Sequence, residues 1–313
     1  MAHPSVDPRA VSPSLVTAQA PPASRRRARF PMMRRLFRDK PLGAAGAVIC
    51  AIFLFCGIFA GWLAPYGVNE INMMARLQPP SWAHLFGTDN LGRDIFSRCL
   101  YGAQLSVVIG LSAATLATLV SLVLGILCGY LGGKLDLVVQ RMVDAWMSFP
   151  DLIILIVVVS VLGPGSWQIV CTLGLLLGIG GSRIVRGAVV SVRENMYVHA
   201  AQSIGASTSR ILWRHILWRH ILPNVLPPVI VLFTTRVGTA ILAESGLSFL
   251  GLGVPPPAPT WGGMLSGDGR TFMFQGPWLA LAPGICLTVV VYAINVYGDA
   301  MRDLLDPRLR GGR

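Results

Sequence analysis

The chain has 313 residues, of which 53% are hydrophobic and only 13% are charged. Soluble domains carry about 25% charged residues, so the composition excludes an ordinary soluble protein and predicts one that crosses a membrane several times. The formal net charge of +12 raises the alternative of nucleic-acid binding. The basic residues lie in the tails and between apolar segments, a pattern typical of membrane proteins, so we expect no nucleic-acid partner.

Six segments are apolar and long enough to cross a membrane, given that a spanning helix needs about 20 such residues. They are residues 42–64, 105–130, 143–163, 166–182, 224–248 and 278–298. The sequence therefore predicts an all-α fold with about six transmembrane helices. Only Pro164 and Gly165 separate the third segment from the fourth.

The lysines and arginines between these segments predict which side of the membrane each part faces. Most of the 26 lie in residues 1–41, 131–142, 183–223 and 299–313. Few lie in 65–104 and 249–277. Because cytoplasmic segments are rich in Lys and Arg, we expect both termini and 183–223 to be cytoplasmic, with 65–104 and 249–277 outside. The transmembrane core would then extend from 105 to 298, with 299–313 as a cytoplasmic tail.

The N-terminal part, residues 1–41, combines two compositions. Residues 1–24 are rich in Pro, Ala, Ser and Val and predict a disordered tail. Residues 25–40 are basic with interleaved apolar side chains. This pattern fits an interfacial helix on anionic lipid, and it equally fits a plain positive flank that orients the first span.

Two further segments contain polar residues at informative positions. Thr88 and Asp89 are good helix caps, and they predict a short amphipathic helix within the outside loop 65–104. Before the third span, Arg141 has helical spacing to both Asp136 and Asp144 and could pair with either.

Glycines recur at every fourth position near the end of the second span, and they are Gly125, Gly129 and Gly133. This spacing allows helices to approach closely in a membrane.

The connector 183–223 is basic and helix-forming although apolar segments flank it. It contains Ala200-Ala201, then Gly205, then Leu222-Pro223. This order resembles the EAA loop of binding-protein-dependent ABC importer permeases.

Four more strings resemble one subfamily of these permeases, the one for dipeptides, oligopeptides and nickel. They are GTDNLGRDIFSR (87–98), the D-x4-R-M-x-D-x5-P pattern of 136–150, ESGLSFLGLGVPPPAPTWGGML (244–265) and YGDAMRDLLDPRLR (297–310). The resemblance covers about residues 34–310 and implies the fold of a type I ABC importer permease.

The resemblance also implies partners and a site. The partners would be a second related permease, two ATP-binding subunits or domains that hold ATP and Mg, and an extracytoplasmic solute-binding protein. The coupling residues that dock on the ATPase would be His199, Ala200, Ala201, Ser203, Gly205, Ala206, Ser207, Leu222 and Pro223. His199 replaces the acidic residue common in the family, so an acidic anchor is missing or is supplied by Glu194.

Three polar residues within the later spans are candidates for the solute pathway or for buried polar contacts, and they are Arg236, Glu244 and Asn295. Charged groups in a span are costly and usually face protein or a polar cavity. Arg236 and Glu244 are too far apart along a helix for a direct pair.

The connector also contains a direct repeat, residues 211–215 followed by 216–220, that adds five residues to the family spacing. We expect one copy to extend the helix that leads into Pro223. The alternative is a duplication that the loop merely tolerates.

The sequence has no phosphate-binding G-x-x-x-x-G-K-[ST], no H-E-x-x-H and no G-x-S-x-G. We therefore expect a non-catalytic chain that binds no cofactor or metal itself, and the resemblance implies a permease subunit in a bacterial plasma membrane. The alternatives are an ATP-independent secondary transporter or channel, and an importer for nickel or another small solute.

Overall fold

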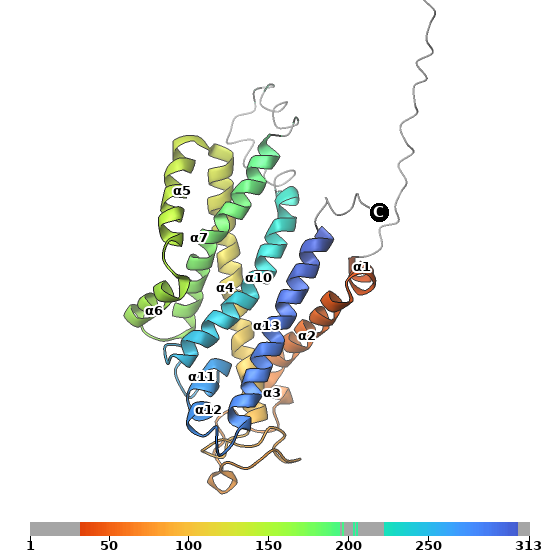
Figure 1. Cartoon of the computed structure of the whole chain (residues 1–313), viewed down its shortest axis with the longest axis vertical. Coiled ribbons are helices and arrows are strands. Elements are labelled where there is room, and N and C mark those ends of the chain that lie inside the picture. Colours follow the sequence, from red (N-terminus) through yellow and green to blue (C-terminus); the bar gives the residue numbers. More distant parts are fainter. Residues whose placement is uncertain (1–31, 195, 197–202, 204, 206–221, 306–313) are drawn as a thin grey trace, which may run out of the picture.

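The computed structural model describes residues 32–194, 196, 203, 205 and 222–305. Within these residues the secondary structure is helical and contains no β-strand. The long helices run roughly along the long axis of the molecule, side by side (Figure 1). The expected all-α fold is therefore confirmed.

Five helices in the described part of the chain are long and apolar enough to cross a membrane. They are α2 (Pro41–Ile58), α4 (Ile95–Leu131), α7 (Ser166–Arg193), α10 (Leu222–Phe249) and α13 (Trp278–Leu305). A sixth span exists if α5 (Gly133–Met147) and α6 (Asp151–Leu162), which meet at a bend of 86°, count as one. This agrees with the prediction of about six spans.

The short elements lie at the ends of the long helices. They are α1 (Met32–Asp39), α3 (Ala60–Leu63), η1 (Met73–Ala75), α11 (Trp261–Ser266) and α12 (Asp268–Thr271). The loop after α3 lies with α11 and α12 at the lower end of Figure 1, opposite the facing ends of α7 and α10. Residues 194–221, between α7 and α10, are called the coupling segment below, after the role that the resemblance implies for them.

The prediction of a separate short helix within 65–104 is wrong. Thr88 and Asp89 do not cap a helix, because the Asp89 carboxylate accepts hydrogen bonds from the backbone N–H groups of Leu91 and Arg93 and closes a turn. The helix instead begins at Ile95, capped by Asp94, whose side chain accepts from the Ser97 N–H at 2.7 Å. It continues without a break to Leu131.

The third and fourth spans also differ from the sequence prediction. Pro150 follows α5 and is the N-cap of α6, and its fixed geometry disfavours helix at the preceding residue. The segment therefore bends instead of running straight from 143 to 163. The helix α7 extends 11 residues beyond the expected end at 182, since Val185 and Val189 are buried against α4 and α10.

The helices α4 and α7 share the most extensive contact among the described helices, and glycines make the contact possible. A Cβ added to Gly125 would lie 2.6 Å from the Cβ of Val185, and one on Gly129 would lie 2.9 Å from the Arg186 carbonyl oxygen. The predicted close approach is confirmed at these two residues. At Gly133 nothing lies within 4 Å, and this residue starts the next helix instead.

Candidate translocation pathway and coupling segment

Arg236 is a cation within α10 that faces other helices of the protein. A Cβ on Gly181 of α7 would lie 3.0 Å from its Nη2 atom, so the guanidinium lies against α7. Asp151, the first residue of α6, is the acidic group whose charge acts on it. No ion pair involving Arg236 occurs within the described residues. This half-buried cation faces α7 from α10, within the electrostatic influence of Asp151, which agrees with the expectation that it faces protein or a polar pathway.

Glu244 lies further along α10 and is fully enclosed, with 1% of the residue exposed. Its carboxylate accepts hydrogen bonds from the hydroxyls of Ser248 at 2.6 Å and Ser245 at 3.4 Å. These local partners hold the end of α10 together and support the alternative of a buried polar contact. They also agree with the prediction that Glu244 and Arg236 do not pair directly.

Asn295 is exposed on α13. A Cβ on Gly238 of α10 would lie 3.7 Å from its Oδ1 atom. The structure therefore does not bring Arg236, Glu244 and Asn295 into one cluster. Each contacts a different part of the bundle. Of the two charged residues, Arg236 faces the neighbouring span α7, whereas Glu244 is hydrogen-bonded within its own helix.

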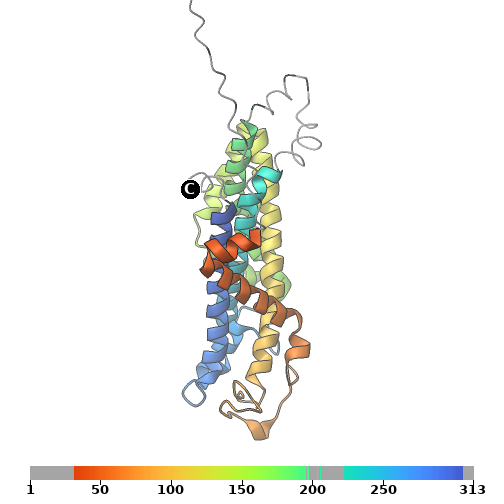
Figure 2. The same ribbon diagram turned by 90° about the vertical axis from the view of Figure 1, so that its right-hand side faces the viewer.

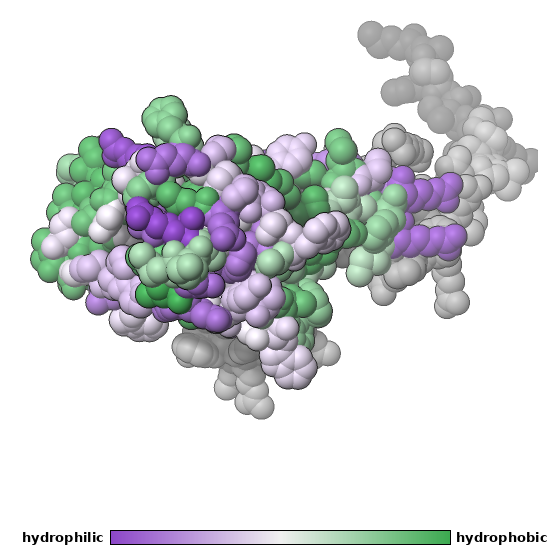
Figure 3. All heavy atoms as spheres, turned by 90° about the horizontal axis from the view of Figure 1, so that it is seen from below, coloured by the Kyte–Doolittle hydropathy of each residue, from purple (hydrophilic) through white to green (hydrophobic). Residues whose placement is uncertain are grey.

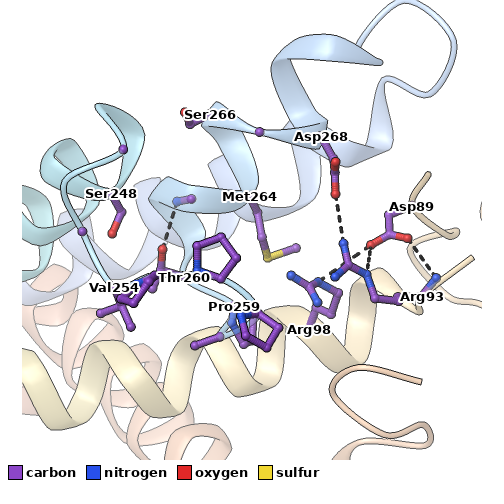
Figure 4. A pocket seen from close by; sticks show the side chains of 18 of the residues that line it. Asp89, Arg93, Arg98, Ser248, Val254, Pro259, Thr260, Met264, Ser266 and Asp268 are labelled. Atoms are coloured by element: carbon purple, nitrogen blue, oxygen red, sulfur yellow. Dashed lines mark hydrogen bonds and ion pairs between the residues drawn. The ribbon is translucent and has the colours of Figure 1, made fainter. Parts of the chain in front are cut away.

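A cavity lies at the end of the molecule that carries α11 and α12 (Figure 4), and no sequence pattern indicated it. This end is named the outer end and the opposite one the inner end, after the sidedness that the basic residues predict. The cavity has a volume of about 370 Å³. Its walls come from the turn before α4, from the segment after α10 and from α11 and α12. Figure 3 views the molecule from this end and shows hydrophilic side chains gathered near its centre.

Charged side chains on one wall of this cavity join segments that are distant in sequence. The Nε atom of Arg93 donates to Asp89 at 2.6 Å, and its Nη2 atom donates to Asp268 at 3.1 Å. Arg98 extends from α4 to the Val68 carbonyl oxygen, at 3.3 Å. The outer loop 65–94 is thereby attached to both α4 and α12.

Two tryptophans form hydrogen bonds between distant segments at the outer end. Trp278 Nε1 donates to the Thr88 carbonyl oxygen, and Trp261 Nε1 donates to that of Cys99, each at 3.1 Å. The strings 87–98 and 244–265 meet where Met264 packs against the cluster of Ile95, and nothing local in either string indicates this contact.

At the opposite end of the bundle, ion pairs join α5 to α7. The Arg186 guanidinium donates to both carboxylate oxygens of Asp136, and Arg183 pairs with Asp144. Arg141 also pairs with Asp144, at 3.3 Å, so that predicted pairing is confirmed. The alternative partner, Asp136, pairs with Arg186 instead.

The coupling segment falls mostly outside the described residues, and so do its residues His199, Ala200, Ala201, Ala206 and Ser207 and the repeat 211–220. Ser203 and Gly205 are described and are exposed. The backbone of Gly205 has φ +81°, the left-handed region that glycine adopts readily. Leu222 and Pro223 form the start of α10, so the connector ends where the sequence indicated.

Comparison of the sequence with known protein families assigns the chain to one of them. The family of binding-protein-dependent transport system inner membrane components matches residues 121–311. The chain belongs to this family. A second family, described as the N-terminal TM domain of oligopeptide transport permease C, matches residues 30–80.

Several relatives match nearly the whole permease. The dipeptide transport system permease protein DppC of Alkalihalophilus pseudofirmus is 39% identical, with 88% of this chain and 89% of that protein covered. The oligopeptide transport system permease protein OppC of Bacillus subtilis is 38% identical, with 88% of each covered. The probable D,D-dipeptide transport system permease protein DdpC of Escherichia coli is 37% identical, with 88% and 91% covered.

A solved structure of the MetNI methionine ABC transporter in inward-facing conformations is similar to 67% of this permease. The match also covers 96% of the chain of that transporter, at 17% sequence identity and a TM-score of 0.48.

Proposed function

We propose that this permease forms half of the pathway of an ATP-driven importer for dipeptides or oligopeptides. The observation that carries the proposal is the set of relatives at 37–39% identity over 88% of the chain, which are named as dipeptide and oligopeptide permeases. A second, related permease would supply the other half. Two ATP-binding subunits would bind and hydrolyse ATP with Mg, and an extracytoplasmic binding protein would deliver the peptide.

The bundle itself would change the side to which the pathway opens. Binding of ATP favours the conformation in which the ATP-binding subunits close, and the segment around Gly205 transmits that change to α7 and α10. A ligand shifts such an equilibrium only by its difference in affinity for the two conformations. This chain therefore performs no bond chemistry and contributes surfaces whose contacts differ between the two states.

Reconstitution tests this function. Proteoliposomes that contain both permeases and both ATP-binding subunits should accumulate a radiolabelled dipeptide only with ATP and the binding protein. Omission of ATP and an ATP-binding subunit that cannot bind nucleotide are the controls. Peptide uptake without ATP would instead support a secondary transporter, and uptake of nickel without peptide uptake would overturn the substrate class.

The sidedness is part of the proposal, with both termini and 183–223 in the cytoplasm. In a cysteine-free background, Ser81→Cys and Gln275→Cys should react with an impermeant thiol reagent added outside. Ser203→Cys should react only after the membrane is opened. All three positions are exposed in the structure, so lack of labelling cannot result from burial within this chain. Outside labelling at Ser203 would contradict the orientation.

Arg236 is the residue that we place at the pathway. Arg236→Leu should lower peptide uptake at least tenfold, because it removes the cation that faces α7 from α10, while Arg236→Lys retains the charge and most of the uptake. Thr239→Leu, which alters an exposed position on the same helix, is the control. If Arg236→Leu transports normally at equal expression, the role in the pathway is wrong.

A further inference from the structure

The short helix α1 divides its side chains by character around its axis. With about 100° of rotation per residue, Met33, Leu36 and Phe37 fall on one side and the three arginines fall on the other. These are Arg34, Arg35 and Arg38. Met33 is 67% exposed and Phe37 is 54% exposed, whereas Leu36 is buried. One apolar residue thus faces the protein, and two apolar residues face outward beside a basic face.

Leu36 attaches α1 to the bundle. It packs in a cluster with Ala44 of α2 and Ala300 of α13. Just after α1, Lys40 pairs with Asp303 of α13 at 2.5 Å. These contacts attach one side of α1 to the bundle and leave its outward face uncovered within the described residues.

The first span places α1 at the membrane surface. The helix α2 has 18 residues and is about 27 Å long, slightly less than the roughly 30 Å hydrocarbon core. The whole of α2, together with α3, is therefore needed to cross the bilayer, and Lys40 lies at its edge. Figure 2 shows α1 lying across the long axis of the bundle instead of continuing α2, so α1 runs along the surface.

We propose that α1 is a binding site for the anionic phospholipids of the cytoplasmic leaflet. Met33 and Phe37 enter the boundary between headgroups and acyl chains, and the arginines contact phosphate groups at the same depth. A flank that served only to orient the first span would need the positive charge, but not this separation of faces or the attachment through Leu36. The site goes beyond the proposed transport function, because it concerns the membrane and not the solute.

A nitroxide at Met33→Cys, in a cysteine-free background of the complete transporter, tests the site directly. The complex is placed in nanodiscs of phosphatidylcholine alone or in an equimolar mixture with phosphatidylglycerol. We expect the nitroxide to become less mobile and more accessible to oxygen than to a water-soluble relaxation agent only when phosphatidylglycerol is present. Each arginine near an anionic surface changes partition about fivefold, so the triple variant Arg34→Gln/Arg35→Gln/Arg38→Gln should lose the response.

Two further variants separate lipid binding from other effects. The corresponding triple lysine variant should keep the response, because it preserves the charge. Arg302→Gln, which removes an exposed cation from the last turn of α13, should also keep it.

Three results would overturn the proposal. Equal immersion in both bilayers would show that α1 does not select anionic lipid, and no immersion in either would make it a plain positive flank. A nitroxide that is immobile and shielded from oxygen in both would show that another protein subunit covers this face. Uptake measured in proteoliposomes of the same two lipid compositions keeps this outcome separate from any failure of the transport function.

Discussion

The two ends of this permease use charged residues in opposite ways. At the outer end, Asp89 and Arg93 expose only 4% and 12% of their side chains, and they join the outer loop to α12. At the inner end, Arg141 exposes 78% of its side chain and Asp144 exposes 43%. The same residue types are therefore enclosed in the outer pair and hydrated in this inner pair, whereas the inner pair of Arg186 and Asp136 is intermediate, with 35% and 16% exposed.

Burial decides how much each set of ion pairs contributes to stability. Removal of one partner from a buried pair leaves an uncompensated charge and costs several kcal/mol, whereas exposed pairs contribute about 0–1 kcal/mol. The outer end should therefore behave as one fixed unit. The inner end can exchange its pairs at little cost, which suits the end where the coupling segment attaches.

The largest effect is expected from breaking the outer cluster, the ion pairs of Asp89, Arg93 and Asp268. Asp89→Asn leaves Asp268 as the remaining acidic partner of Arg93 and should lower the free energy of unfolding by at most about 3–5 kcal/mol, the cost of a fully uncompensated buried charge. Thermal unfolding in nanodiscs measures the loss. The control is Glu70→Gln, which alters an exposed acidic residue in the same loop. A variant as stable as the control would mean that the outer end is not held by this pair.

The next effect sharpens the comparison at the inner end. Gly205→Val places a branched side chain at φ +81°, where a left-handed conformation costs about 1–2 kcal/mol. Peptide uptake by the reconstituted transporter should fall about 5- to 30-fold, while membrane insertion is unchanged. Gly205→Asn tolerates this conformation and should retain most of the uptake. Equal activity of both variants would remove the turn from the coupling mechanism.

A smaller effect is expected from the pair that joins α5 to α7. In a double-mutant cycle of Asp144→Asn and Arg183→Gln, the coupling energy from thermal unfolding should stay below about 1 kcal/mol. Both side chains are more than 40% exposed, so water screens their attraction. A coupling energy near that of the outer cluster would erase the difference between the two ends.

The smallest expected effect is a pH dependence at the outer cluster. Burial raises the pKa of Asp268 above its ordinary value, and the charge of Asp89 raises it further, although Arg93 and Arg98 act in the opposite direction. The native state thus holds this proton more tightly than the unfolded chain does. Stability should therefore fall as pH rises from the ordinary pKa of Asp through the raised pKa.

Asp268→Asn lacks this titration, so its unfolding midpoint should vary less with pH than that of the wild type across the same window. Glu70→Gln again serves as the control. Identical pH profiles for wild type and Asp268→Asn would show that Asp268 does not titrate differently in the folded protein.

The sequence by itself determined the number and approximate place of the spans, because hydropathy is a local property that needs only about 20 consecutive residues. It also gave the order of the motifs that identify the family, including the end of the connector at Leu222-Pro223. The close approach at Gly125 and Gly129 followed from spacing alone, since a four-residue repeat places both on one helix face.

Only the tertiary structure decided where the charged residues find partners. Arg93 and Asp268 are 175 residues apart, and no local pattern indicates that their segments meet. Asp136 likewise pairs with Arg186 because α7 continues past the expected end of its span, and that extension depends on the burial of Val185 and Val189 by neighbouring helices. Partner choice depends on packing between distant segments, whereas hydropathy and helix capping depend on neighbours in the chain.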